Sequence, residues 1–323
     1  MKSFLFILVV LIIASKASSQ SLAGITGKQD TSYTTYSAYL STKKTYPDCK
    51  IVKEFHFTSV AEKRDITYSR LGKRELLLDA FYPKEKSKRV RAAILIIHGG
   101  GWRTGNRTQH YPLAERLADL GYVCFTPEYR LSTEALFPAA IYDIKSAIRW
   151  VKENAKKYNI DTSKITVLGF SAGGELAAFM GTTNGMTEFE GTKNSTFSSF
   201  VQAVVDIDGT LSFVHPESGE GDDSKKTSAG TYWFGYSKKE SPELWQKASP
   251  LTYAGEQTAP TLFINSSVAR MHAGREDYIK ILSSFKIYTE VKSFENSPHS
   301  FCLFDPWFEP TVKYIDEFLK KVF

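Results

Sequence analysis

Hydrophobic residues in this chain form short unbroken runs that alternate with longer segments of mixed polarity. The run ILII at residues 94–97 is continuous, which is typical of a strand buried on both faces of a sheet. The mixed segments repeat apolar residues three and four positions apart, as in a helix with one buried face. We expect strands at residues 75–82, 91–100, 122–130, 164–170, 200–209, 259–267 and 288–295. We expect helices at residues 111–121, 137–158 and 308–321.

The alternation of strands and helices predicts an α/β fold with a mostly parallel central sheet and helices on both faces. The pattern breaks between residues 211 and 258, where the chain is polar and contains glycine and aromatic residues. We expect this segment to be a cap-like insertion over the carboxyl edge of the sheet. Its acidic residues have a spacing that fits no calcium motif, so we expect a solvated loop; they are Glu217, Glu220, Asp222 and Asp223.

The first 17 residues have the organisation of a secretory signal peptide. Lys2 precedes an apolar run from Phe4 to Ala14, which is short for a bilayer span. Small residues follow this run, and we expect cleavage near Ala17, with a membrane-anchoring helix as the alternative. We therefore predict an exported protein, periplasmic or extracellular, with no stable membrane insertion after signal cleavage.

The remaining chain is expected to form an extended N-terminal leader at residues 18–54 and a catalytic domain at residues 55–323. The formal net charge is +6, and removal of the signal peptide would lower it by two, because Lys2 and Lys16 leave with it. This mildly basic balance, without a basic stripe or an aromatic RNA motif, predicts no nucleic-acid partner. The oligomeric state stays open.

The chain has three cysteines, too few for a disulfide framework. Cys124 lies in an apolar run and is expected in the core. A bridge between Cys49 and Cys302 is left open, since an exported protein meets an oxidising compartment.

A candidate nucleophile lies in the segment VLGFSAGG at residues 167–174, between a predicted strand and a helix-like stretch. The pattern Gly169-x-Ser171-x-Gly173 in this context is typical of a nucleophile elbow, whose glycines permit the sharp turn. The N-terminal N–H groups of the following helix would face developing negative charge. A serine needs a base, and His299 is the one of the six histidines that follows the last predicted strand in a loop.

Three consecutive glycines, at residues 99–101, come at the end of the strand predicted at 91–100, in the segment HGGGW. Without side chains, the backbone can approach a substrate closely and direct N–H groups at it. We assign Gly100 and Gly101 as oxyanion donors, joined by the N–H of Ala172. We expect His98 to brace this loop.

The carboxylate that orients His299 is harder to place. We expect this carboxylate in the loop after the strand at 259–267, near Ala269, but the sequence has no carboxylate there. We prefer Asp208, at the end of the preceding strand. The alternatives are Glu276 and Asp277, at the start of the next helix, while Asp206 is expected to be structural.

Several residues near these motifs are candidates for substrate binding. Arg270 and Arg275 follow the strand at 259–267, and a guanidinium pairs with a carboxylate in bidentate fashion, which suits galacturonate. The alternative is that they brace the loop. Trp102, Trp233 and Tyr236 are candidates for stacking on a sugar ring. For Trp233 and Tyr236, the alternative is a place in the core of the cap.

The segments HGGGW, PEYRL, FPAAIYDIKSAIRWV and GFSAGG together resemble the α/β-hydrolase superfamily, in its hormone-sensitive-lipase-like and carbohydrate-esterase branch. The resemblance covers residues 60–322. The segments DIDG, INSSVARMHAGR and PHSFCLFDPWFEPTVKYI are similar to those of secreted bacterial esterases that act on pectin or xylan.

This resemblance implies an α/β-hydrolase fold and a serine esterase that removes acetyl or methyl esters from a plant polysaccharide or oligosaccharide through an acyl-enzyme. No metal or cofactor is implied. The alternatives are a serine peptidase, a small-ester or lipid esterase of the same fold, and a non-catalytic carbohydrate-binding relative.

Overall fold

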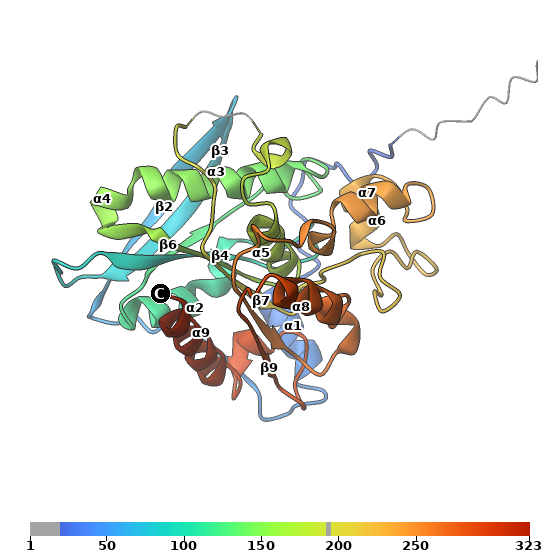
Figure 1. The fold of residues 1–323 in the computed structure, drawn as a ribbon. Helices are drawn as coiled ribbons and strands as arrows, with labels where there is room; N and C mark the ends of the chain where they lie inside the picture. The colour runs from blue at the N-terminus through green and yellow to red at the C-terminus, as the bar shows by residue number, and fades with distance from the viewer. Residues whose placement is uncertain (1–19, 192–194) are drawn as a thin grey trace, which may run out of the picture.

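An eight-stranded sheet forms the centre of the protein, in the order β2-β3-β5-β4-β6-β7-β8-β9 (Figure 1). The computed structural model describes residues 20–191 and 195–323, so the predicted signal peptide lies outside the described residues. The β2–β3 and β3–β5 pairs are antiparallel, and every other neighbouring pair in this sheet is parallel. The mostly parallel sheet predicted from the sequence is therefore confirmed.

Three of the inner strands are buried along their whole length. Every residue of β5, β7 and β8 is buried, as expected for strands covered on both faces. The hydrophobic pattern located all of the strands except β2, which alternates poorly and lies at the edge of the sheet. Their bounds are β2 Val60–Leu71, β3 Arg74–Pro83, β4 Arg91–Ile97, β5 Val123–Pro127, β6 Ile160–Phe170, β7 Ala203–Ile207, β8 Thr261–Asn265 and β9 Thr289–Ser293.

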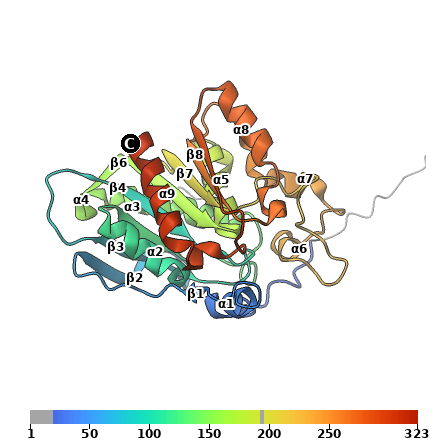
Figure 2. The ribbon, with the colours of Figure 1, turned by 90° about the horizontal axis from the view of Figure 1, so that it is seen from below.

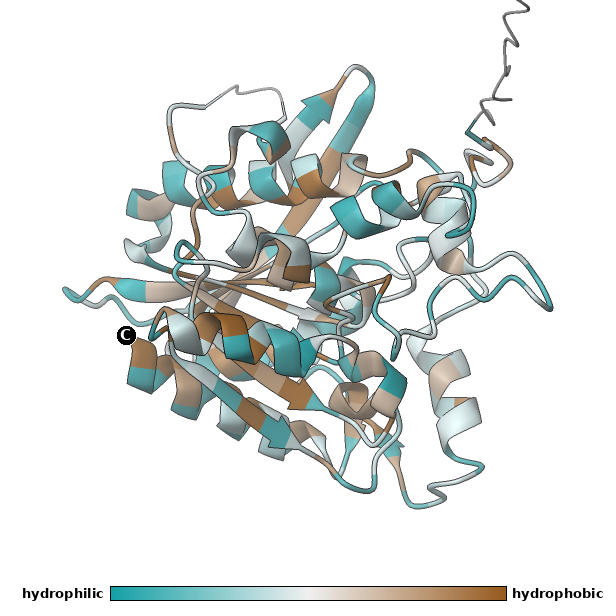
Figure 3. Ribbon diagram, turned by 45° about the vertical axis from the view of Figure 1, so that its right-hand side comes forward, coloured by the Kyte–Doolittle hydropathy of each residue, from teal (hydrophilic) through white to brown (hydrophobic). Residues whose placement is uncertain are grey.

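Helices cover both faces of the sheet (Figure 2). On one face, α2 (Tyr111–Asp119) and α9 (Phe308–Val322) pack in one hydrophobic cluster. On the other face, α3 (Ala139–Glu153) and α5 (Ala172–Thr182) pack in a second cluster. Figure 3 shows hydrophobic colour along the central strands and mixed colour on the surrounding helices, so the apolar stripes that predicted the helices are the stripes that meet the sheet.

Two smaller helices complete these layers. α8 (Arg275–Ser284) covers β8 through the edge-to-face contact of Tyr278 with Phe263. The long helix predicted at 137–158 is divided at Asn154, after which α4 (Ala155–Tyr158) forms one turn.

The insertion between β7 and β8 carries two helices, α6 (Ala229–Phe234) and α7 (Pro242–Lys247). They lie together beyond one end of the sheet (Figure 1). Trp233 and Trp245 are fully buried between the cap and the sheet. Trp233 thus belongs to the core of the cap, the alternative that the sequence left open.

The N-terminal segment does not have the extended form expected of a leader. It forms helix α1 (Thr35–Thr42) and strand β1 (Lys50–Ile51), which pairs antiparallel with β10 (Phe304–Asp305). Its first described residues reach the cap, where the Ser21 amide donates to the Gly235 carbonyl at 2.6 Å. The segment is therefore packed on the fold at both of its ends.

The three cysteines are free and buried. The bridge between Cys49 and Cys302 that the sequence left open is not formed, and both side chains pack in the hydrophobic cluster around α9. Within residues 20–191 and 195–323, no helix combines the length and the apolar composition needed to cross a bilayer.

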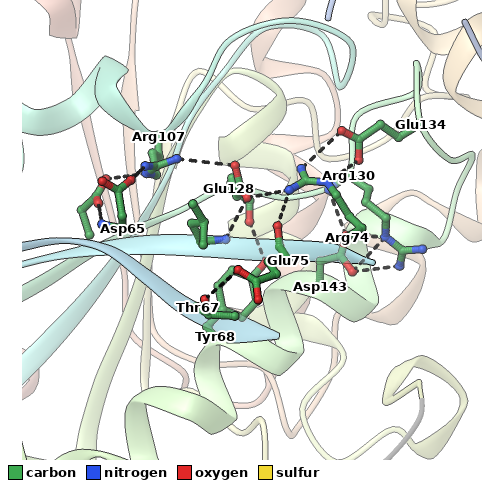
Figure 4. Close-up of polar contacts among 12 residues, drawn as sticks. Asp65, Thr67, Tyr68, Arg74, Glu75, Arg107, Glu128, Arg130, Glu134 and Asp143 are labelled. Carbon is green, nitrogen blue, oxygen red and sulfur yellow. Dashed lines mark hydrogen bonds and ion pairs between the residues drawn. The ribbon is translucent and has the colours of Figure 1, made fainter. Parts of the chain in front are cut away.

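The segment PEYR after β5 is held by ion pairs (Figure 4). Glu128 accepts hydrogen bonds from Arg74 at 2.9 Å and from the Leu77 amide at 2.8 Å. The Arg130 guanidinium contacts the Asp143 carboxylate of α3 at 2.8 Å and 2.9 Å. Between them, Tyr129 is positioned to support the loop that follows β4. The PEYR segment thus has a structural role.

We predict that Arg130→Met destabilises the fold by roughly 2–4 kcal/mol, because the almost fully buried Asp143 carboxylate would lose its cation. Urea denaturation measures this loss of unfolding free energy. Arg116→Met is the control, since both partners of Arg116, Glu309 and Asp119, are partly exposed, and we expect it to cost less than about 1 kcal/mol. Equal losses in the two variants would contradict this role of the buried pair.

Candidate active site

Ser171 lies on a sharp turn between β6 and α5. Its backbone has φ 56° and ψ −120°, in the left-handed half of the Ramachandran map, which a non-glycine residue rarely adopts. The glycines on either side are required by close approach. A Cβ atom on Gly169 would lie 1.9 Å from the Gly173 carbonyl oxygen, and one on Gly173 would lie 2.2 Å from that of Ile97. The pattern Gly-x-Ser-x-Gly is therefore dictated by backbone packing.

The structure brings Ser171, His299 and Asp208 together in one hydrogen-bonded row. His299 Nε2 lies 2.9 Å from Ser171 Oγ, and His299 Nδ1 lies 2.9 Å from Asp208 Oδ2. His299 comes from the loop after β9, and Asp208 directly follows β7. This arrangement can remove a proton from the serine hydroxyl and stabilise the imidazolium that results.

The alternative acids lie elsewhere. Glu276 pairs with Arg275, and Asp277 lies 3.4 Å from His215. In the part of the chain that the structure describes, neither carboxylate has a hydrogen bond or an ion pair with His299.

Asp208 is fully buried, but it is well supplied with partners. Oδ1 accepts the Ser266 amide at 2.7 Å and lies 3.5 Å from His272 Nε2. Burial by itself would raise the pKa of Asp208, but the contacts with His272, His299 and Ser266 outweigh it and lower the pKa to about 2. The carboxylate is therefore ionised at neutral pH, as the orientation of His299 requires. The sequence did not assign His272 to this group.

The glycine loop after β4 faces the same site. Gly100 and Gly101 have φ values of 128° and 58°, and a Cβ on Gly100 would lie 2.3 Å from the Thr104 carbonyl oxygen. Both glycines line a cavity together with Ser171 and His299. Ala172 opens α5, so its N–H has no acceptor within the helix. These backbone groups are placed to meet negative charge on a substrate oxygen.

His98 braces this loop. It is buried, stacks on Tyr129 with ring centroids 4.4 Å apart, and contacts the Gly99 carbonyl at 2.9 Å. The Tyr129 hydroxyl donates to the His98 carbonyl at 3.0 Å. Burial lowers the pKa of His98 to about 4, so the ring is neutral at neutral pH.

Trp102 was expected to contact substrate, and the structure corrects this. It is 4% exposed and stacks on Trp233 with ring centroids 4.8 Å apart. Its indole N–H donates to Glu175 Oε2 at 2.9 Å. Trp102 therefore joins the glycine loop to the core of the cap and offers no free ring face to a sugar.

Arg270 and Arg275 also do not line the cavity. Arg270 pairs with Glu220 at 3.2 Å, whereas Arg275 donates to the Asn265 side chain at 2.6 Å and pairs with Glu276. Both arginines thus brace loops, the alternative reading of these residues.

The cavity has a volume of about 460 Å³, within the range of small-molecule sites. The cap-like insertion predicted over this edge of the sheet supplies part of the wall, and the N-terminal segment, which sequence reasoning did not assign to the site, supplies another part. The lining residues from the N-terminal segment, the end of the glycine loop and the cap are Asp30, Ser32, Tyr33, Arg103, Thr104, Lys226, Thr227, Ser228, Ala229 and Tyr232. No local pattern marks residues 30–33 as part of a site, because they reach it only through long-range packing.

One group of side chains in the described residues has a spacing that would suit a metal ion: Glu54, His56 and Glu115. Glu115 already accepts the Phe55 and His56 amides at 2.7 Å and 3.0 Å. None of the three residues lines the cavity.

Residues 78–271 match the family model described as BD-FAE. This chain belongs to the BD-FAE family. The matched range includes the glycine loop, Ser171 and Asp208, while His299 follows it.

Among curated proteins, esterase LipQ of Mycobacterium tuberculosis is 42% identical over 125 residues, which are 38% of this chain and 30% of that protein. Arylacetamide deacetylase of Oryctolagus cuniculus is 31% identical over 145 residues, which are 43% of this chain and 36% of that protein. The chain thus spans about a third of the length of these relatives.

Two solved structures share the fold. A truncated carbohydrate esterase from gut microbiota has a TM-score of 0.67 at 25% identity, covering 84% of this chain and 100% of that chain. A bifunctional GH43-CE protein of Bacteroides eggerthii has a TM-score of 0.68 at 26% identity, covering 80% of this chain and 38% of that chain. The BD-FAE chain has the α/β-hydrolase fold that its motifs indicated.

We predict that Asp208→Asn slows covalent labelling of Ser171 by a fluorophosphonate about a thousandfold or more, because an amide leaves the base in the wrong tautomer. Labelling rates measured by mass spectrometry test this. Glu276→Gln and Asp277→Asn are the matched controls and are expected to label at the wild-type rate. A large loss in either control with no loss in Asp208→Asn would reassign the acid.

We predict that Glu175→Gln leaves the unfolding free energy within about 1 kcal/mol of the wild type. Burial raises the pKa of Glu175 well above its usual range, which favours the neutral form, and glutamine still accepts the indole N–H of Trp102. Glu175→Leu removes this acceptor and should cost about 1–3 kcal/mol. Denaturant unfolding of both variants measures this difference. Equal stability of Glu175→Gln and Glu175→Leu would contradict a stabilising hydrogen bond between Trp102 and residue 175.

Proposed function

We propose that this protein is a serine esterase that hydrolyses acetyl or methyl esters on a plant cell-wall polysaccharide, pectin or xylan. The observation that carries the proposal is the row Ser171–His299–Asp208, which opens into a cavity beside Gly100 and Gly101. A nucleophile, its base, a buried carboxylate and backbone donors are the groups that acyl transfer requires.

The proposed reaction follows from these positions. Ser171 Oγ attacks the ester carbonyl carbon while His299 Nε2 takes the hydroxyl proton. The N–H groups of Gly100, Gly101 and Ala172 then stabilise the charge on the carbonyl oxygen. When the bond to the alcohol oxygen breaks, His299 returns the proton to that oxygen. His299 then deprotonates a water molecule, which attacks the acyl-serine, and His299 gives that proton to Ser171 Oγ as the bond to the acid breaks.

The carbohydrate part of the proposal is supported by the structural relatives, two of which are described as carbohydrate esterases. The cap side of the cavity is also polar, with Lys226, Thr227 and Ser228 in its wall. A lipase would instead need an apolar surface for an acyl chain. We retain the predicted export of the protein as part of this proposal, because polymeric cell-wall substrates lie outside the cell.

The other candidates have less support. A small-ester esterase fits the chemistry and is separated from the proposal only by substrate. A peptidase of this fold fits the chemistry too, but neither relative described above is named as one. A non-catalytic carbohydrate-binding protein would have no need of a complete serine–histidine–aspartate row.

The experiment that tests the proposal measures 4-nitrophenol from 4-nitrophenyl acetate, and acetate and methanol from esterified pectin and acetylated xylan. We expect Ser171→Ala to lose at least a thousandfold in each activity that the wild type shows, because no other group here replaces the nucleophile. Ser224→Ala, an exposed cap serine outside the cavity, is the control. Hydrolysis of the small ester but of neither polymer would contradict the proposed polysaccharide substrate. No hydrolysis of any ester would contradict the proposed esterase activity.

A further inference from the structure

The charges in the cavity indicate which sugars it accepts. Resting on the proposed esterase function, we infer that the site selects esters on anionic sugars, with the Lys226 ammonium as the group that binds a substrate carboxylate. The substrate class is therefore a polysaccharide of uronic acids rather than one of neutral sugars.

Most of the charge that lines the cavity is already paired. Arg103 Nε contacts Asp30 Oδ2 at 2.8 Å, and Arg103 also donates to the Gly24 carbonyl at 3.1 Å. Its guanidinium lies over the Tyr232 ring, 4.2 Å from the centroid. Arg103 thus ties the N-terminal segment to the glycine loop and the cap, and its charge is balanced by Asp30.

Lys226 remains as an unbalanced cation. It lines the cavity with Ser171, and within residues 20–191 and 195–323 it makes no ion pair or hydrogen bond. Its ammonium is therefore available to a ligand in the same cavity as the nucleophile.

Within the described residues, none of the acidic residues of the cap forms an ion pair with Lys226. Glu220 pairs with Arg270 at 3.2 Å, Glu217 lies 3.4 Å from His215, and Asp222 accepts the Ser224 amide at 3.0 Å. Each of these carboxylates is thus engaged away from the cavity, and none of them lines it.

Asp223 instead fixes the segment that carries Lys226. Asp223 Oδ1 accepts the Ser228 amide at 2.6 Å, and Oδ2 accepts the Thr231 hydroxyl at 2.8 Å. Ser228 in turn caps α6 by accepting the Thr231 amide at 3.1 Å. The backbone on which Lys226 stands is therefore held at the rim of the cavity.

The remaining lining suits a sugar acid. Thr227, next to Lys226 in the sequence, adds a hydroxyl to the lining, and Tyr33 and Tyr232 add aromatic residues to the same cavity. An ammonium beside a hydroxyl binds a carboxylate through charge-assisted hydrogen bonds, while aromatic rings pack against sugar faces. Each unesterified ring in a chain of uronic acids carries a carboxylate, so a ring next to the ester can offer one to Lys226.

The test compares kcat/KM of the full protein on three substrates: acetylated oligogalacturonides, acetylated xylo-oligosaccharides and 4-nitrophenyl acetate. Lys226→Gln should lower kcat/KM about fivefold on the oligogalacturonides alone, the size expected of an exposed ion pair. Lys226→Glu should lower it further through repulsion. Lys225→Gln, the neighbouring lysine outside the cavity, is the matched control and should leave all three values unchanged.

A second readout is ionic strength. The wild-type preference for oligogalacturonides should shrink as salt rises, and the salt dependence should be weaker in Lys226→Gln. An equal effect of Lys226→Gln on all three substrates, or the same loss in Lys225→Gln, would overturn the inference while the esterase stands. Wild-type protein that cleaves none of the substrates would overturn the proposed function itself.

Discussion

The site depends on the contact of three strand ends without intervening side chains. Gly173, which follows β6, approaches the Ile97 carbonyl at the end of β4 so closely that a methyl group does not fit. Gly209, which follows β7, is equally close to the Glu175 amide. The Ser171 amide then donates to the Ile207 carbonyl at 2.8 Å. Because these backbones touch, Asp208 comes within reach of His299, and the nucleophile and the glycine loop come within reach of one small substrate group.

Three carboxyl groups are buried beneath this contact, and the directions of their pKa shifts differ because their partners differ. Glu175, Asp206 and Asp208 are all buried, and burial raises the pKa of the first two well above the usual range. Asp208 alone of these three lies against two imidazoles and the Ser266 amide, and its pKa falls to about 2. One buried acid is therefore charged and orients His299, while burial favours the neutral form of its two neighbours.

The cap and the N-terminal segment convert this chemical centre into a cavity. Trp102 stacks on Trp233 of α6, and Arg103 pairs with Asp30, so two consecutive residues of the glycine loop are tied to distant parts of the chain. The residues that position the oxyanion donors thus also position the walls. Because of these contacts, a change in the cap is expected to shift the oxyanion donors of the glycine loop.

Local pattern was sufficient to determine much of this protein. Continuous apolar runs located the parallel strands. The two glycine motifs located Ser171, Gly100 and Gly101, because a tight turn requires small residues at adjacent positions in the sequence. Asp208 was preferred over Glu276 and Asp277 because it lies at the end of a rigid strand, which is a predictable place for a side chain.

Tertiary structure alone decided the substrate surface. Trp102, Arg270 and Arg275 have the right chemistry and sequence position, but each is occupied by a protein partner. Asp30, Tyr33 and Lys226 line the cavity instead, although they lie far from Ser171 in sequence. Strand periodicity and tight turns depend on residues a few positions apart, whereas the walls of a cavity depend on side chains that meet only after the whole chain has packed.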